Sequence, residues 1–379
     1  MAKNNFKKIV RKIHLWLGLS SGLVVFITAL SGCLLSFEDE LDSFFSPEIH
    51  IPNQYTDAKV GLDSIAETIH TAYPNYSIKQ LFLFSDPHKT YLVRAFSKTK
   101  EERLLSVNPY TGAIQKNVNF NNRFFIKVLH LHRYLLVDGV GQIINGISTL
   151  CFIILLVSGF IIWLPKKTKY LKQRLLVKWN ASTKRVNWDL HNALGFYVIP
   201  FAFIIGITGL VWSFDWVENS LYFIFDGKPK QTINFEKKHI AFEKVAQQPL
   251  SLDNIKSKTD SIFNFEGNLR FIFENSSKAE KIRVIKEQTG TLIPNKRSQL
   301  YISAKTGEIL KILPYRSSTT GQKVRRMIYP IHTGTIFGWP SRILICITSL
   351  VVASLFITGF FIWYNKNYGK KKKKSNRIR

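Results

Sequence analysis

The sequence predicts an α-helical membrane bundle of four helices, built as a tandem duplication, with two small α+β modules outside the membrane. Two observations predict this class. The 379-residue chain gathers its apolar residues into four long uncharged runs, and a helix rising ~1.5 Å per residue crosses a hydrocarbon core of ~30 Å in about 20 residues. The second half also repeats the order of the first half, as span, loop module and span.

The first and third apolar runs, residues 14–36 and 191–213, share one plan. Each run begins with a histidine and carries a glycine four residues later. Each also places a small hydroxyl residue followed by glycine near its far end. These pairs are Ser31-Gly32 and Thr208-Gly209. Small residues let helices, or a flat cofactor, approach closely, so the shared plan indicates two equivalent helices.

The second and fourth runs, residues 143–164 and 343–364, form another pair at an offset of 200 residues. Both again contain a hydroxyl residue followed by glycine, and both place a tryptophan near the end of the run. The matching residues are Ser158-Gly159-Phe160 with Thr358-Gly359-Phe360, and Trp163 with Trp363. A hydroxyl–glycine pair therefore occurs in all four runs.

The formal charge of +28 is explained by topology rather than by a nucleic-acid partner. Three short flanks, before residue 14, at 165–190 and after residue 364, hold 21 of the 53 basic residues. Such flanks stay in the cytoplasm by the positive-inside rule. The loop at 38–141 has 11 basic and 12 acidic residues, whereas the loop at 214–342 has 21 and 12. We therefore expect both loops outside, both termini in the cytoplasm, and no nucleic acid.

These expectations describe a multi-pass membrane protein in contact with lipid, and they divide the chain into nine segments. The four spans are expected at 14–37, 142–164, 191–214 and 342–364. The cytoplasmic segments are expected at 1–13, 165–190 and 365–379, and the extracytoplasmic modules at 38–141 and 215–341, the first of which ends in a juxtamembrane helix.

The N-terminal 33 residues also resemble a lipoprotein signal peptide. A basic start precedes an apolar run that ends in Leu30-Ser31-Gly32-Cys33. The run exceeds the apolar core of about 7–15 residues that signal peptides usually have. The hydroxyl–glycine pair also recurs in spans where cleavage has no meaning. We therefore favour a retained first span.

The three cysteines, Cys33, Cys151 and Cys346, all lie inside apolar runs. Their spacing gives no disulfide framework. A thiol in such surroundings packs as a small apolar side chain. The sequence therefore predicts three buried, unpaired cysteines.

Each loop contains one helical pattern followed by three strand patterns and a Thr-Gly turn. The helical patterns have apolar residues at i, i+3 and i+4, and glycine suits a turn that needs positive φ. In the first loop the helix is expected at 61–73, the strands at 76–84, 89–96 and 103–108, and the turn at Thr111-Gly112. In the second loop they are expected at 252–263, at 268–274, 281–286 and 299–304, and at Thr306-Gly307.

Taken together, the chain resembles the PepSY-associated transmembrane family, in which paired membrane helices bracket PepSY-type modules. The resemblance covers nearly the full length. The residues that carry it are Arg11-Lys12-Ile13-His14-Leu15-Trp16-Leu17-Gly18, His191-Asn192-Ala193-Leu194-Gly195, the two Thr-Gly turns, and Ile331-His332-Thr333-Gly334 leading into Gly338-Trp339-Pro340.

This resemblance implies a function. Some members of the family are inner-membrane haem proteins that reduce ferric siderophores, so it implies an oxidoreductase that releases iron in the periplasm. Electrons would come from a separate cytoplasmic reductase or from quinol. Two alternatives stay open: PepSY-like modules that bind a peptide or a partner without catalysis, and a haem relay to a periplasmic protein acceptor.

Two histidines begin the equivalent first and third spans. Packing these helices side by side would bring His14 and His191 to one depth. An ionisable ring at the membrane needs a partner and usually faces the bundle interior. Two neutral imidazoles facing each other across a bundle supply both axial ligands of one haem iron. The alternative is that each ring hydrogen-bonds lipid or backbone at the interface.

A second pair is expected just before the second and fourth spans. At the 200-residue offset His132 aligns with His332, whereas His130 aligns with Pro330. We therefore predict that His132 and His332 bind a second haem b, with His130 as the substitute ligand. The remaining loop histidines, His50, His70, His88 and His239, are expected to be solvated.

Other site chemistry is not supported by the sequence. There is no CxxC, HExxH, P-loop or GxGxxG pattern, which argues against an attached zinc site or nucleotide-binding domain. Zinc or copper on the histidines is possible in principle, but two ligands at each depth make a poor tetrahedral site. A haem brings four nitrogens of its own, so two histidines complete it.

Overall fold

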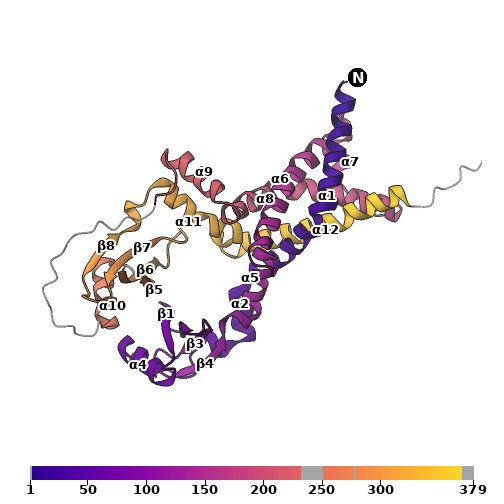
Figure 1. The fold of residues 1–379 in the computed structure, drawn as a ribbon. Helices are drawn as coiled ribbons and strands as arrows, with labels where there is room; N and C mark the ends of the chain where they lie inside the picture. The colour runs from indigo at the N-terminus through magenta and orange to yellow at the C-terminus, as the bar shows by residue number, and fades with distance from the viewer. Residues whose placement is uncertain (1, 232–250, 277–278, 369–379) are drawn as a thin grey trace, which may run out of the picture. The chain divides into compact units, whose positions relative to one another are not determined.

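The computed structural model describes residues 2–231, 251–276 and 279–368 (Figure 1). Residue contacts divide the chain into two compact units. The bundle unit comprises Met1–Phe37, Val128–Glu218 and Ile328–Arg379, and the sheet unit comprises Glu38–Lys127 and Asn219–Met327. Each unit is therefore assembled from both halves of the chain. His239, which the sequence predicts to be solvated, lies outside the described residues.

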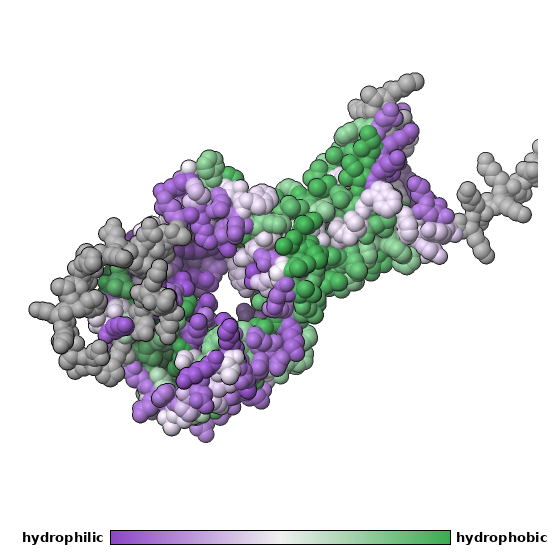
Figure 2. Space-filling model, viewed as in Figure 1, coloured by the Kyte–Doolittle hydropathy of each residue, from purple (hydrophilic) through white to green (hydrophobic). Residues whose placement is uncertain are grey.

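Four long helices form the bundle unit: α1 (Ala2–Leu35), α6 (Val140–Trp163), α8 (Thr183–Ser213) and α12 (Trp339–Asn367). Among the described residues, these four helices are long and apolar enough to cross a membrane. α1 packs against α6 and α12, and α8 packs against the same two helices, which closes a ring. Figure 2 shows hydrophobic residues on the visible outer surface of these helices. The prediction of four apolar helices is confirmed.

Small and branched side chains fill the centre of the ring. Leu156 of α6, Val198 and Ala202 of α8, and Val352 of α12 are buried against one another. Larger apolar residues point outward, and Ile147 and Ile347 are about half exposed. In a water-soluble bundle such residues would face the interior. Lipid around the helices allows the bulky apolar side chains to face outward instead.

A short helix precedes the second and the fourth long helix. α5 (Phe124–Tyr134) leads into α6, and α11 (Thr320–Thr333) leads into α12. The turns between them use positive φ, at Gly139 in the first case and at Gly334 and Gly338 in the second. Other short helices are η2 (Thr168–Tyr170), α7 (Leu171–Leu175) and η4 (Thr335–Phe337) in the bundle unit, and α9 (Asp215–Asp226), which continues from the bundle unit into the sequence of the sheet unit.

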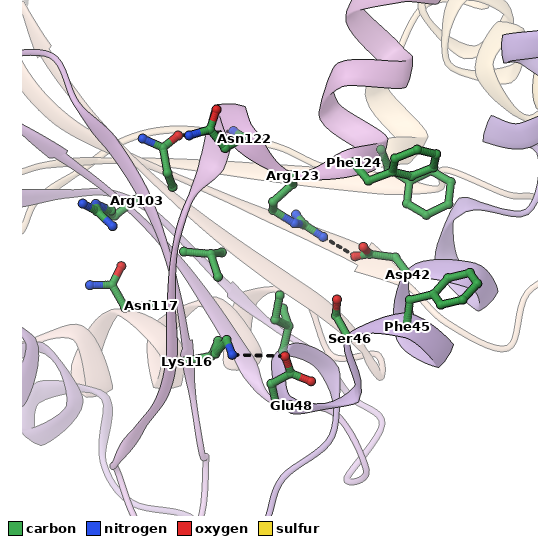
Figure 3. Close-up of a pocket in the computed structure, with 14 residues that line it drawn as sticks. Asp42, Phe45, Ser46, Glu48, Arg103, Lys116, Asn117, Asn122, Arg123 and Phe124 are labelled. Atoms are coloured by element: carbon green, nitrogen blue, oxygen red, sulfur yellow. Dashed lines mark hydrogen bonds and ion pairs between the residues drawn. The ribbon is translucent and has the colours of Figure 1, made fainter.

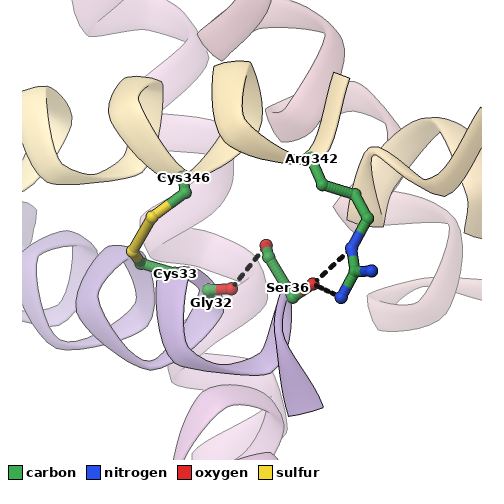
Figure 4. Close-up of a disulfide and its surroundings, with 5 residues drawn as sticks. All are labelled: Gly32, Cys33, Ser36, Arg342 and Cys346. Atoms are coloured by element: carbon green, nitrogen blue, oxygen red, sulfur yellow. Dashed lines mark hydrogen bonds between the residues drawn. A yellow bond between two sulfur atoms is a disulfide. The ribbon is translucent and has the colours of Figure 1, made fainter. Parts of the chain in front are cut away.

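A disulfide between Cys33 and Cys346 corrects the prediction of three unpaired cysteines (Figure 4). The two residues lie on α1 and α12, which pack side by side, and their Cα atoms are 4.6 Å apart. They are 313 residues apart in sequence, so no local spacing could reveal the pair. Cys151 is a free cysteine, as expected.

An arginine lies close to the disulfide on α12. The Arg342 guanidinium is buried and donates from Nε, over 2.8 Å, to the backbone oxygen of Ser36 just beyond the end of α1 (Figure 4). It also lies 5.0 Å from the Phe37 ring and 5.2 Å from the Trp339 ring. Carbonyl groups at the end of a helix lack partners within that helix, so Arg342 stabilises the end of α1 against α12.

The sheet unit contains one antiparallel sheet of eight strands with helices attached. Its first half supplies α2 (Glu38–Phe45), α3 (Pro47–His50), α4 (Leu62–Ala72), β1 (Tyr76–Leu83), β2 (Tyr91–Ser97), β3 (Glu102–Val107), β4 (Ile114–Asn119) and η1 (Phe120–Asn122). Its second half supplies α10 (Leu252–Ile262), β5 (Gly267–Ser276), β6 (Ala279–Gln288), β7 (Arg297–Ser303), β8 (Ile309–Leu313) and η3 (Tyr315–Ser317). The predicted helices and strands of both loops are confirmed.

The strand order is symmetric about the middle of the sheet: β4-β3-β2-β1-β5-β6-β7-β8. β1 and β5 pair antiparallel at the centre, with Leu81 opposite Phe271. Both residues are almost fully buried, and they belong to one hydrophobic core that includes Ile65 of α4 and Ile255 of α10. The two loop modules, which the sequence presents as separate, therefore share one sheet and one core.

Two aspartates cap each other's helices across this symmetric unit. Asp253 at the start of α10 accepts hydrogen bonds from the backbone nitrogens of Leu62 and Asp63, over 2.8 Å and 3.1 Å. Asp63 at the start of α4 accepts one from the backbone nitrogen of Leu252 over 2.6 Å. Free N–H groups at a helix start need such acceptors. α4, which starts after Gly61, therefore obtains its only side-chain cap among the described residues from the other half of the chain, whereas Asp63 adds to the cap that Ser251 gives α10.

The sequence did not reveal the fourth strand of each half. β4 and β8 follow the Thr-Gly turns, in which Gly112 and Gly307 have φ of 72° and 70°. Both are edge strands with little burial, so they lack the alternation of apolar and polar residues that identified the other strands. The positive φ expected of the two glycines is confirmed.

Candidate functional site

Two pairs of histidines face each other inside the bundle unit. The first pair is His14 of α1 and His191 of α8, whose ring centroids are 6.5 Å apart with planes at 86°. The second pair is His132 of α5 and His332 of α11, at 6.2 Å and 64°. Each pair joins one histidine from the first half of the chain to its counterpart in the second half. The structure thus brings together both pairs that the sequence proposed as ligand sets.

Each histidine ring is held by a hydroxyl group through its Nδ1 atom. All four hydroxyls belong to the hydroxyl–glycine pairs that the sequence repeats. The contacts are His14 with Ser158 Oγ at 2.9 Å, His191 with Thr358 Oγ1 at 2.9 Å, His132 with Ser31 Oγ at 3.2 Å, and His332 with Thr208 Oγ1 at 2.9 Å. Every ring is therefore oriented by a neighbouring long helix.

The hydrogen bonds assign the proton to Nδ1 in the second pair. Nδ1 of His132 also lies 2.9 Å from the backbone oxygen of Thr28, and Nδ1 of His332 lies 3.2 Å from that of Ile205. A carbonyl oxygen only accepts, so both Nδ1 atoms must donate. The neutral rings then carry a lone pair on Nε2, the form that binds a metal.

The first pair reaches the same protonation state through equivalent partners, because the backbone carbonyls of Leu155 and Leu355 also accept from His14 and His191. Ser158 Oγ donates to the Leu155 carbonyl, and Thr358 Oγ1 donates to the Ser354 carbonyl over 2.9 Å. Because each hydroxyl hydrogen is used in that bond, the oxygen accepts from the histidine Nδ1–H. Nε2 is again the atom left with a lone pair.

The glycine of each pair makes room for the same ring. A Cβ atom added at Gly32 would lie 2.9 Å from Cε1 of His132, and one at Gly359 would lie 3.1 Å from Cε1 of His191. The corresponding distances are 3.2 Å from Gly159 to His14 and 3.3 Å from Gly209 to His332. Any side chain at these positions would press on the ring. The sequence showed these pairs four times, but their role as histidine supports was not inferred from it.

The first pair lines a cavity of about 360 Å³ within the bundle unit. Its walls are mainly apolar and include Gly18, Leu156 and Val352. Arg11 and Lys366 line it as well, as do Trp163 and Trp363. Such a cavity, with two facing imidazoles and few other polar groups, suits a flat apolar molecule that carries a metal.

His130, the substitute ligand, lies apart from both pairs. Its Nδ1 is 3.8 Å from Asp138, its side chain is 46% exposed, and its ring contacts Tyr134. Within the described residues, no three histidine, cysteine, aspartate or glutamate side chains come close enough to hold a metal ion by themselves. Two imidazoles at each depth therefore remain the ligand set that the geometry offers.

The sheet unit has a separate cavity of about 660 Å³, shown in Figure 3. Arg123 forms an ion pair with Asp42, and Lys116 Nζ lies 3.3 Å from Glu48. Two buried atoms of its lining, Arg123 Nε and Asn117 Oδ1, have no hydrogen-bond partner. The cavity therefore offers one donor and one acceptor to a polar ligand.

Charged groups near this cavity are shifted by burial and by one another. Burial, and then the charge of Asp39, raise the pKa of Glu38 to about 7. Burial also opposes ionisation of Asp42, but the His50 hydrogen bond and the charge of Arg123 outweigh it and lower the pKa of Asp42. His50 Nε2 lies 2.7 Å from Asp42 Oδ2 and the side chain is 18% exposed. The expectation of a solvated His50 was therefore wrong.

Comparison with known proteins identifies a family. The family model described as the PepSY-associated TM region matches residues 11–366, which include all four histidines of the two pairs and all four long helices. No curated protein matches the chain. Since the family model covers nearly the whole sequence, the chain belongs to the PepSY-associated TM family, a family of membrane proteins.

Proposed function

We propose that the protein is a bacterial inner-membrane haem protein that binds two haem b groups and passes electrons outward to reduce a ferric siderophore. The geometry of the histidine pairs supports this most directly. A metal–imidazole bond of about 2.0 Å, plus about 1.1 Å from the nitrogen to the ring centre, separates two trans imidazole centroids by about 6.2 Å. The two pairs have 6.5 Å and 6.2 Å.

The support around each ring agrees with axial ligation. A ligand histidine usually donates its second ring nitrogen to an oxygen acceptor, which fixes the ring and its tautomer. Ser158 and Thr358 accept from the first pair, and the carbonyls of Thr28 and Ile205 accept from the second pair. When bound, a bis-imidazole haem supplies reversible one-electron transfer without an open coordination position.

The two pairs lie at two depths of the bundle. From His14 to Gly32, which packs against His132, α1 rises by about 27 Å at ~1.5 Å per residue. This is close to the ~30 Å thickness of a hydrocarbon core. The helices thus hold ligands near both faces of a bilayer, and apolar side chains between them exclude water. We propose that electrons cross the membrane from the first pair to the second.

The proposed direction rests on the distribution of basic residues. Both termini and the 165–190 segment would lie in the cytoplasm, and the two PepSY-like modules of a tandem duplication would lie outside. The symmetric strand order and the mutual caps of Asp63 and Asp253 support the duplication. Reporter fusions at residues 100 and 280 should be active outside, and one at residue 175 inside. Activity of the first two on opposite sides would exclude this topology.

The proposed electron acceptor is Fe(III), and the oxygen ligands of the chelate explain why its reduction releases the iron. Fe(III) is held tightly by hard anionic oxygens, and uptake of one electron gives Fe(II), which those oxygens bind less strongly. The electron comes from a cytoplasmic reductase or from quinol. The second half of the extracytoplasmic chain carries an excess of nine positive charges between residues 214 and 342. Such an excess attracts an anionic ferric chelate.

The experiment uses the purified full-length protein in detergent. The protein is reduced with dithionite, excess reductant is removed, and a ferric hydroxamate or catecholate is added with an Fe(II) trap. We expect reoxidation of the haem with matching appearance of Fe(II), and loss of this reaction in His332→Ala. His130→Ala is the matched control. Haem that stays reduced across several ferric chelates, but is oxidised by a periplasmic protein, would favour the relay; absence of haem would favour a binding module.

A further inference from the structure

The cavity of the first histidine pair has a chemically distinct end. Arg11 lies one helical turn before His14 on α1, and Lys366 lies two turns after Gly359, the glycine that supports His191. Both cations line the cavity together with Asn367. They occupy the N-terminal end of α1 and the C-terminal end of α12. The remainder of the lining is largely apolar, so the cavity is amphipathic along its length.

Neither cation has an acidic side chain as an ion-pair partner among the described residues. Among the described residues, neither Arg11 nor Lys366 forms an ion pair, although other basic side chains of the chain do so. Both side chains are exposed, and their positive potential at one end of an apolar cavity attracts an anionic group. A cavity of this kind therefore prefers a ligand with negative charge at that end.

A third group in the same cavity also lacks a partner. Trp163 is 5% exposed and stacks on Phe196, with ring centroids 3.8 Å apart. Its indole Nε1 is one of four buried side-chain atoms without a hydrogen-bond partner in the described part of the chain. A buried N–H that makes no hydrogen bond is unfavourable, because it has lost its bond to water without replacing it. An acceptor supplied by a ligand would remove that cost.

We propose that Arg11, Lys366 and the Trp163 indole N–H bind the carboxylates of the molecule that occupies the cavity. This rests on the proposed function, under which that molecule is haem b and the carboxylates are its two propionates. The donor set is suited to this: two cations pair with two carboxylates, and one neutral N–H adds a hydrogen bond. The propionates then lie at the end of the cavity formed by the basic ends of α1 and α12.

The arrangement has an electrical consequence that can be measured. Oxidised haem carries one more positive charge than reduced haem, so nearby cations favour the reduced form. Removing Arg11 or Lys366 should therefore lower the midpoint potential of this haem. We expect about a tenfold change in the reduction equilibrium for each, which is ~59 mV for one electron. Trp163→Phe should mainly accelerate haem loss, by roughly fivefold to tenfold for a hydrogen bond of about 1 kcal/mol.

The experiment compares matched variants of the full-length protein in a background that lacks the second pair, His132→Ala with His332→Ala. Arg11→Gln and Lys366→Gln are measured by redox titration against Lys8→Gln, which removes the same charge from α1 but does not line the cavity. Trp163→Phe is measured by haem transfer to an acceptor protein against Trp363→Phe. Trp363 also lines the cavity, but its indole nitrogen is not among the four buried atoms without a partner.

A second set of measurements tests the contribution of the haem carboxylates alone. The same proteins are reconstituted with haem b or with its dimethyl ester, which has the same ring and iron but no charged propionates. We expect Arg11→Gln and Lys366→Gln to accelerate loss of haem b more than Lys8→Gln does, and we expect this difference to disappear with the ester, because the ester has no carboxylates to pair with the cations. Equal potentials and equal loss rates for Arg11→Gln, Lys366→Gln and Lys8→Gln would overturn this inference and leave the haem proposal standing. A protein that binds no haem would overturn both.

Discussion

The two histidine pairs are held by the same chemical unit but carried by different kinds of helix. His14 and His191 belong to long helices, whereas His132 and His332 belong to the short helices α5 and α11. Each ring of both pairs meets a hydroxyl at Nδ1 and a backbone carbonyl; the carbonyls belong to Leu155 and Leu355 in the first pair and to Thr28 and Ile205 in the second. The support of the rings is therefore the same in both pairs, and only the kind of helix that carries each ring differs.

The largest expected effect tests whether the two pairs are separate sites. His14→Ala and His191→Ala should each abolish the same low-spin haem component and leave the other, because one axial ligand is lost. His132→Ala and His332→Ala should abolish the other component. Redox difference spectra of membranes measure this, with His130→Ala as the control. Variants of both pairs that keep the full spectrum would show that the ligand assignment is wrong.

A graded effect is expected at the four supporting glycines. Alanine at Gly32 would place Cβ 2.9 Å from its histidine ring, against 3.1–3.3 Å at Gly359, Gly159 and Gly209. Overpacking of this kind costs about 1–3 kcal/mol, so Gly32→Ala should lower the low-spin fraction most. Gly18→Ala is the control on the same helix, because its nearest neighbour lies 3.8 Å away. Equal losses in Gly18→Ala and Gly32→Ala would mean that alanine affects α1 in general.

A smaller effect of similar size is expected in both pairs at their hydroxyls. Ser158→Ala and Thr358→Val remove the hydroxyl that accepts from the first pair, at a cost of about 1 kcal/mol and roughly fivefold faster haem loss. Ser31→Ala and Thr208→Val should have a similar effect on the second pair, since every ring of both pairs keeps a backbone carbonyl acceptor. Haem transfer rates for the two components measure both effects. A loss confined to one pair would contradict the equivalent support described above.

The smallest effect is expected from the disulfide. Cys33 follows Gly32, which touches His132, so the Cys33–Cys346 bond lies near the second pair and far along α1 from the first. Cys33→Ser with Cys346→Ser should increase haem loss from the second pair by about twofold to threefold, a few tenths of a kcal/mol. The first pair should be unchanged. Cys151→Ser is the control; equal changes at both pairs would indicate general loosening of the bundle.

Much of this arrangement could be predicted from the sequence because it depends on long uniform patterns and on repetition. The apolar runs predicted the long helices, and the 200-residue offset selected His132 over His130. The supports of the rings could not be predicted, because Ser158 and His14 lie on different helices and are 144 residues apart. The disulfide and the edge strands β4 and β8 were missed for related reasons: they depend on long-range packing or on strands with little apolar pattern.

The central strand pair has a consequence for how the chain is made. β1 can pair with β5 only after nearly 200 further residues have been synthesised. The start of α4 can be capped by Asp253 only after a similar length of chain has been made. Until then the first module exposes a strand edge and an uncapped helix, which are open to wrong pairing. Two further spans must be inserted during that interval. Completion of the sheet is therefore a late step in biogenesis, and it requires both halves of the sheet unit to lie on the same side of the membrane.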